Sequence, residues 1–180
     1  MIKTFTDCIN EYGSQYRLTK ALISKEIFKI EDGIYSDCEI VPEIAVIAKK
    51  YPHAIITGDY AFYYHGMTDV IPDRYSLATR ANAAKITDSR VFQIYIQDDI
   101  FELGVQTIDI EGYEIHIYDK ERMLIELLRR KNKIPYDLYK EILNKYRTSV
   151  QTLQIWRIQE YADIFPKSRK IKKALDEEVM

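Results

Sequence analysis

The sequence is poor in cysteine and has no long apolar run, and each shortage excludes a class of protein. Its two cysteines, Cys8 and Cys38, lie far apart and its three histidines are scattered, so no metal-ligand spacing is present. We expect both thiols to be free and buried in a reducing cytosol. Apolar runs such as residues 44–48 are far shorter than the ~18 residues of a membrane span. The first residues also lack the apolar stretch of a signal peptide, which predicts a cytoplasmic protein without membrane contact.

Glycine, proline and net charge are also low. Six glycines and five prolines are spread along 180 residues, so no flexible linker marks a domain boundary. The formal net charge of −2 argues against indiscriminate binding to polyanions. It conceals a gradient, because residues 119–180 carry fifteen Lys/Arg against ten Asp/Glu, whereas residues 1–45 carry five against eight. Apolar residues make up 47% of the chain, which is enough for a folded core.

The first forty residues have the pattern of two helices followed by a β-hairpin. Apolar spacing predicts a helix over residues 4–12 and a second over residues 14–24, with Gly13 as a C-cap between them. A strand-like segment then leads into Asp32-Gly33, which is a strong hairpin signal. This is the order of elements in a winged helix, in a reduced form, because a full one has three helices before the wing.

The second of these helices has the character of a DNA-recognition helix. Arg17 and Lys20 lie three residues apart and share a face opposite the apolar Leu18. Residues 14–29 hold four basic residues and one acidic residue, in otherwise acidic surroundings. Such a face can contact phosphates and base edges, although an ordinary amphipathic helix with a solvated basic face has the same pattern. The candidate DNA-binding residues are Ser14, Gln15, Arg17, Lys20, Lys25 and Lys29.

The rest of the chain alternates between strand and helix patterns. Apolar or alternating segments predict strands at residues 53–57, 75–79, 91–96, 105–110 and 113–118. Helical patterns cover residues 42–51, 59–65, 119–131, 135–146, 153–165 and 168–175. We therefore predict an α+β protein, with a mixed sheet in the middle and helices toward the C-terminus.

A strand, a glycine turn and a short helix meet at Gly58. Nucleotidyltransferase-like folds present a phosphate site with this layout, but Asp59 stands where a hydroxyl would donate to the phosphate. An active transferase also needs carboxylates arranged to hold Mg²⁺. Asp98 and Asp99 are adjacent, so on a strand they would point to opposite faces. Asp109 and Glu111 are two residues apart, but Glu111 lies in the Glu111-Gly112 turn. We therefore predict no catalytic residue, no metal site and no cofactor.

The segment from Asp119 to Arg130 is a second candidate motif. Asp119 can cap its helix, and Glu121 lies in the first turn, where negative charge is favourable. Arg122 has no such local explanation beside a stripe of Met and Leu. It is either a plain surface residue or one that reaches a carboxylate on the sheet, because buried arginines are usually paired.

Two other features leave alternatives open. The sequence has fifteen tyrosines, and those at Tyr60, Tyr63 and Tyr64 can either pack in the core or stack on bases. The basic run from Lys167 to Lys173 is either a solvated helix face or a source of phosphate contacts.

Taken together, these motifs resemble those of the AbiEi antitoxins, which belong to bacterial abortive-infection type IV toxin–antitoxin systems. Residues 57–67 are similar to that family's Gly-x-Ser-Ala-Leu-x-x-His-Gly-Leu motif, and residues 119–127 look like its Glu-Arg-Thr-Leu-x-Asp motif. Residues 29–35 resemble the Arg-x-Gly-x-Tyr end of its winged helix. The resemblance covers about residues 10–150 in the right order. The departures from the motifs are Tyr60 for Ser, Met123 for Thr and Glu126 for Asp.

The resemblance implies a fold, a function and partners. The fold would be a reduced N-terminal winged helix over residues 1–40, followed over residues 41–180 by a nucleotidyltransferase-like mixed-sheet domain whose C-terminal helical part begins at about residue 136. The first domain would bind inverted repeats in double-stranded promoter DNA and repress its own operon. The second would be a non-catalytic antitoxin that opposes a nucleotidyltransferase-type toxin without a stable complex. The antitoxin-domain motif residues are Gly58, Asp59, His65, Gly66, Asp119, Glu121 and Arg122.

Two other functions fit parts of the sequence. An active nucleotidyltransferase would use Mg²⁺ and a nucleoside triphosphate, and the missing carboxylate pair counts against it. A binding protein of the same fold that does not contact DNA would keep only the motifs of the second domain. We expect an antitoxin and transcriptional regulator, and not an enzyme.

Overall fold

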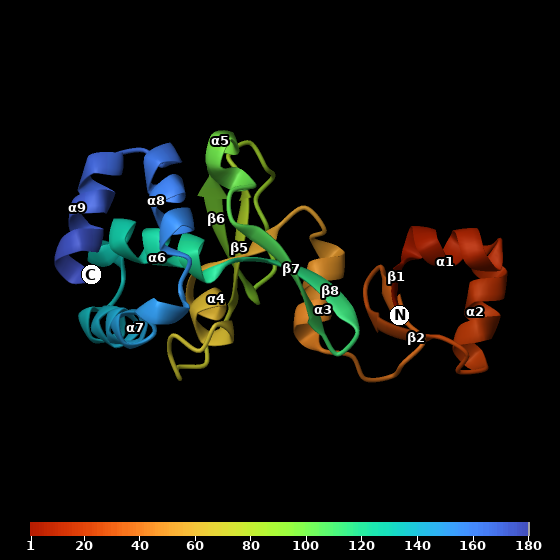
Figure 1. Cartoon of the computed structure of the whole chain (residues 1–180). Helices are drawn as coiled ribbons and strands as arrows, with labels where there is room; N and C mark the ends of the chain where they lie inside the picture. Colours follow the sequence, from red (N-terminus) through yellow and green to blue (C-terminus); the bar gives the residue numbers. More distant parts are fainter. Residues whose placement is uncertain (180) are drawn as a thin grey trace. The chain divides into compact units, whose positions relative to one another are not determined.

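The computed structural model describes residues 1–179 and has the α+β architecture that the sequence predicts (Figure 1). It contains one sheet of three strands and one of five. The chain forms two compact units, of which the first comprises Met1–Ala54 with Thr107–Ile115. The second comprises Ile55–Gln106 and the chain from His116 onward. No helix within the described residues is long and apolar enough to cross a membrane.

The first unit begins with a strand and two capped helices. Its elements in chain order are β1 (Ile2–Thr4), α1 (Phe5–Tyr12), α2 (Gln15–Ile23), β2 (Phe28–Glu31), β3 (Ile34–Ser36) and α3 (Glu43–Lys50). The Thr4 hydroxyl accepts a hydrogen bond from the Asp7 N–H at 3.1 Å and so caps α1. Gly13, with a φ of 78°, ends α1 in the left-handed conformation that favours glycine. Ser14 caps α2 in the same way as Thr4 caps α1.

The three-stranded sheet is antiparallel, with the strand order β1-β3-β2. The hairpin of β2 and β3 turns at Asp32-Gly33, as the sequence predicts. β1 carries no strand signal in the sequence, because three residues are too few for an alternating pattern. It becomes a strand by pairing with β3, with Ile2 opposite Ser36, which satisfies backbone groups on the open side of the hairpin.

Two apolar clusters form the core of the first unit. The helices α1 and α2 contribute to one, which contains Cys8, Leu18, Ala21, Ile27 and Tyr35. The other joins the sheet to α3 and contains Ile2, Ile34, Ala45 and Val46, with Tyr113 packed against it. The expectation of two buried thiols is correct for Cys8 and wrong for Cys38, which is exposed. Cys38 lies in the loop after β3, outside both clusters.

The five-stranded sheet has the strand order β6-β5-β4-β8-β7. Most of it belongs to the second unit, but Thr107–Ile115, which include the turn of the β7–β8 hairpin, belong to the first. The elements from this sheet onward are β4 (Ile55–Ile56), α4 (Gly58–Tyr64), β5 (Tyr75–Arg80), β6 (Val91–Ile96), α5 (Asp98–Phe101), β7 (Val105–Ile110), β8 (Tyr113–Tyr118), α6 (Lys120–Arg129), α7 (Tyr136–Thr148), α8 (Ile155–Ile164) and α9 (Ser168–Glu178), with short 3-10 turns at Lys131–Lys133 and Val150–Thr152. The sheet is mixed, because β4 runs antiparallel to β5 and parallel to β8, while β5 and β6 are parallel.

The C-terminal helices of this unit gather around α6. This helix contacts α4, α7, α8 and α9, and Figure 1 shows α6 to α9 grouped on one side of the sheet. Eight consecutive residues of α6, from Glu121 to Leu128, are buried as a result. An adjacent acidic pair follows the strand at residues 91–96. Asp98 and Asp99 lie in the first turn of α5, not on a strand, where their charge suits the positive end of the helix dipole.

Candidate functional site

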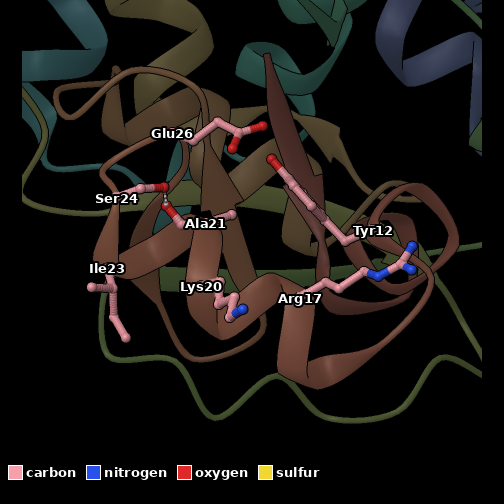
Figure 2. Close-up of a pocket in the computed structure, with 7 residues that line it drawn as sticks. All are labelled: Tyr12, Arg17, Lys20, Ala21, Ile23, Ser24 and Glu26. Carbon is pink, nitrogen blue, oxygen red and sulfur yellow. Dashed lines mark hydrogen bonds between the residues drawn. The ribbon is translucent and has the colours of Figure 1, made fainter.

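The basic face of α2 is open to solvent. Gln15, Arg17 and Lys20 are exposed, whereas Leu18 and Ala21 are buried in the core. Figure 2 shows Arg17 and Lys20 extending from the helix. Both line an open depression with a volume of about 660 Å³. The other residues that line this depression are Tyr12, Ala21, Ile23, Ser24 and Glu26. The helix therefore offers two cations and an amide to a ligand.

Two of the three remaining predicted DNA-binding residues already have local roles. The Ser14 hydroxyl accepts a hydrogen bond from the Arg17 N–H at 3.3 Å and caps α2. Lys29 Nζ lies 2.6 Å from Asp32 Oδ1 in an exposed ion pair, which a phosphate can replace at little cost. Lys25 is exposed directly after the helix and has a φ of 57°. DNA binding by these residues stays a prediction.

The two motif segments of the second unit are joined by direct contacts. His65 Nε2 donates a hydrogen bond to the Tyr118 carbonyl at 2.7 Å, just before the second motif begins. Thr57 Oγ1 lies 3.7 Å from Met123 Sδ in the core. Burial lowers the pKa of His65 and outweighs the opposing effect of the Tyr118 carbonyl, which favours the neutral ring. Segments that are distant in sequence thus form one structural junction.

The first motif shapes the backbone around α4. Gly58 begins the helix with a φ of 54°, and a Cβ there would lie 2.9 Å from Ser76 Cβ. Gly66 follows the helix with a φ of 69° and so ends it. Asp59 is exposed in the first turn, where a negative charge stabilises the helix. Each of these residues therefore has a structural reason, and an antitoxin role for them stays a prediction.

Arg122 is fully buried and is held by carbonyls and a carboxylate. Its side chain is 0% exposed. Nη1 donates hydrogen bonds to the carbonyls of Ile100 at 2.7 Å and Leu103 at 3.3 Å. Nη2 donates to Glu126 Oε1 at 3.0 Å. Arg122 is therefore not a surface residue, and its carboxylate partner lies one turn along the same helix, not on the sheet.

Aromatic rings surround the Arg122 guanidinium. Its centre lies 4.5 Å from the Tyr118 ring centroid and 4.2 Å from that of Phe165. Burial lowers the pKa of Arg122, and the negative charge of Glu126 opposes this. The rings exclude water, so the charge of Arg122 depends on the few polar groups that contact it.

Asp119 and Glu121, the first two acidic residues of the second motif, accept hydrogen bonds that hold the fold together. Asp119 Oδ1 accepts a hydrogen bond from the Arg122 N–H at 2.7 Å, and its Oδ2 accepts one from the Tyr161 hydroxyl at 2.9 Å. Burial raises the pKa of Asp119, and these hydrogen bonds oppose the rise. Glu121 Oε1 accepts a hydrogen bond from the Gln154 N–H at 2.9 Å. The sequence indicates the cap but not these partners, because they lie 33 and 42 positions away.

Gly104 belongs to the same junction, although no sequence pattern singles it out. Its carbonyl accepts a hydrogen bond from the Asp119 N–H at 2.7 Å. Its φ is 76°, and a Cβ there would lie 2.6 Å from Arg122 Cβ. In the sequence Gly104 is a single glycine before a predicted strand, and a glycine in such a position indicates no more than a turn.

The polar groups of the two motifs are thus engaged within the fold. His65, Asp119, Glu121 and Arg122 each contact a neighbouring segment of the second unit. In the part of the chain that the structure describes, no group of three or more His, Cys, Asp or Glu side chains is arranged to hold a metal ion. These contacts hold α4, α6 and α8 against the C-terminal end of β8.

Two comparisons with known proteins found no match. No protein-family model matches the chain, and no curated protein is significantly similar to it in sequence.

Proposed function

We propose that the chain is a non-catalytic antitoxin of a type IV toxin–antitoxin system that also binds its own promoter DNA as a repressor. The observation that carries the DNA-binding half is the topology of the first unit. β1 precedes two helices and pairs with β3, which gives the strand order β1-β3-β2. This is the order of elements in a winged helix that has lost its first helix.

The position of α2 supports its role as the recognition helix. In helix-turn-helix proteins the second helix enters the major groove with its N-terminal residues against the base edges. α2 is the second helix of this unit, and Gln15 and Arg17 lie in its first turn. Lys20 lies about one turn further along, and Lys29 lies on the hairpin, where each suits a phosphate contact.

The second unit supports the antitoxin half. Its mixed sheet, with β4 leading through the Gly58 turn into α4, fits a nucleotidyltransferase-like fold. The hydrogen bond from His65 to the Tyr118 carbonyl gives a physical reason for the two motifs to occur together. Asp119 and Glu121 are held by partners on or next to α8, which favours a framework role over a catalytic one.

A mobility-shift assay with the DNA upstream of the gene tests the DNA-binding half. We expect the wild-type protein to shift this fragment and the Arg17→Ala/Lys20→Ala variant to bind about tenfold more weakly, because two contacts to the duplex are lost. The salt dependence should also weaken, since each phosphate contact contributes about 0.9 to the slope of log K against log[salt].

An Arg74→Ala/Lys85→Ala variant is the matched control, because it removes two exposed cations that lie in the second unit. Its affinity for the fragment should equal that of the wild type. A wild-type protein that leaves the fragment unshifted, or that shifts it regardless of salt, would contradict the repressor half of the proposal.

Co-expression with the product of the adjacent gene tests the antitoxin half. We expect that product alone to arrest growth and the wild-type chain to restore it. With both genes under unrelated promoters, the Arg17→Ala/Lys20→Ala variant should restore growth equally well, because neutralisation is assigned to the second unit. Colony counts over a range of induction levels provide the measurement. Growth arrest that the wild-type chain does not relieve would rule out this half.

A further inference from the structure

A cavity lined by cations lies in the second unit and has no part in either half of the proposed function. It has a volume of about 660 Å³ and is bounded by the end of β6, the end of α6 and the start of α9. Sites for small molecules and cofactors have volumes of roughly 300–1,000 Å³, so the cavity is large enough for a ligand of nucleotide size.

The charge of this cavity is strongly positive. Five cationic side chains line it, namely Arg129, Arg130, Lys133, Lys167 and Lys170. Glu126 is the single carboxylate among the described residues that line it. This carboxylate is shared, because it lies 3.0 Å from Arg122, 3.2 Å from Arg129 and 3.5 Å from Arg130. One negative charge cannot neutralise three guanidinium groups, so Glu126 leaves a positive excess.

The three lysines add further positive charge to the cavity. Among residues 1–179, no ion pair involves Lys133, Lys167 or Lys170. The cations come from two separate parts of the chain, around residues 129–133 and residues 167–170. Bringing them together costs electrostatic energy in the free protein, and a bound anion would recover it.

The start of α9 shows a second feature that suits an anion. Lys167 precedes the helix with a φ of 66°, a left-handed conformation that is uncommon outside glycine and that tends to occur at functional sites. No side chain within the described residues caps α9. The Lys170 N–H donates a hydrogen bond to the Lys167 carbonyl at 2.8 Å, so only the N–H groups of Ser168 and Arg169, next to the lining lysines, are left without a cap.

We propose that this cavity binds a small molecule that carries an oligophosphate, with the phosphates among Lys167, Lys170 and the α6 arginines. A compact group of several negative charges matches cations that surround one cavity, whereas the phosphates of a nucleic-acid strand are spread along its length. Tyr95 also lines the cavity and is 50% exposed, which leaves a ring face for a base. Its hydroxyl donates a hydrogen bond to Gln93 Oε1 at 3.2 Å, which helps to hold the ring.

Isothermal titration of the full chain with ATP, inorganic triphosphate and adenosine, without added metal, tests this proposal. ATP and triphosphate should bind saturably below millimolar concentration, and adenosine should not. ATP binding more tightly than triphosphate would identify a nucleotide as the source of the phosphates, and equal affinities would identify the oligophosphate group alone. The Lys167→Ala/Lys170→Ala variant should bind ATP at least roughly tenfold more weakly, because two charge-assisted contacts are removed.

A Lys172→Ala/Lys173→Ala variant is the matched control, since these lysines are exposed on the same helix and do not line the cavity. Its affinity for ATP should equal that of the wild type. The proposal is overturned if neither phosphate probe binds saturably, if both double variants lose affinity equally, or if a short single-stranded RNA displaces ATP at lower concentration. Circular dichroism of each variant confirms that the fold is intact. None of these outcomes affects the promoter or antitoxin proposals, whose tests use other residues.

Discussion

Replacing Arg122 with methionine is expected to lower the free energy of unfolding by about 3–5 kcal/mol, the range for breaking a buried charge pair from one side. The variant leaves the carbonyls of Ile100 and Leu103 without the Nη1 donor. It also removes the cation from between the Tyr118 and Phe165 rings. Urea unfolding monitored by circular dichroism gives the free energy directly.

Arg129→Met is the matched control for this experiment. Arg129 contacts the same carboxylate of Glu126 at 3.2 Å and the same Phe165 ring at 4.6 Å, but its side chain is 30% exposed. Its removal should cost less than about 1 kcal/mol, because solvent screens partly exposed pairs. Equal losses for Arg122→Met and Arg129→Met would contradict the buried junction.

Gly104→Ala is expected to lower the free energy of unfolding by about 3 kcal/mol, the sum of a left-handed backbone penalty and an overpacking penalty. The new methyl group would lie 2.6 Å from Arg122 Cβ and 3.2 Å from Asp119 Oδ1, both on the α6 side of the junction. The backbone must therefore move, which weakens the 2.7 Å hydrogen bond from the Asp119 N–H to the Gly104 carbonyl. Urea unfolding measures the loss.

Gly66→Ala measures the penalty of the left-handed backbone without the penalty of overpacking. Gly66 has a φ of 69°, close to the 76° of Gly104, but no heavy atom among the described residues lies within 4 Å of its added Cβ. Its substitution should cost about 1 kcal/mol, from the backbone conformation alone. If Gly104→Ala and Gly66→Ala destabilise the protein equally, the close approach of Gly104 to α6 is not maintained in solution.

Caps and turns are the parts of this fold that the sequence predicts best. Ser14 and Asp119 each cap the helix that follows them, as their residue types indicate. Glu111 and Gly112 both have positive φ, at 54° and 85°, as a two-residue hairpin turn requires. These features depend on atoms within a few residues of each other, so a short window of sequence contains all the information they need.

The candidate site is predicted less completely. The spacing of Arg17 and Lys20 indicates an exposed basic face, and both residues are exposed. The position of Arg122 among apolar residues indicates that it needs a partner, but not which one. Arg122 and Glu126 lie four residues apart, which is also the spacing of an exposed ion pair on a helix surface. Only the packing of α6 against other helices of the second unit turns that surface pattern into a buried one.

The sequence by itself indicated the capped helices and the two hairpin turns, and which faces of the helices are apolar or basic. Those properties follow from side-chain periodicity and from hydrogen bonds between near neighbours. The tertiary structure alone decided that β1 completes a three-stranded sheet, that Arg122 is buried, and that cations from the end of α6 and the start of α9 line one cavity. The reason is that strand order and burial depend on contacts between segments distant in sequence, which no local pattern specifies.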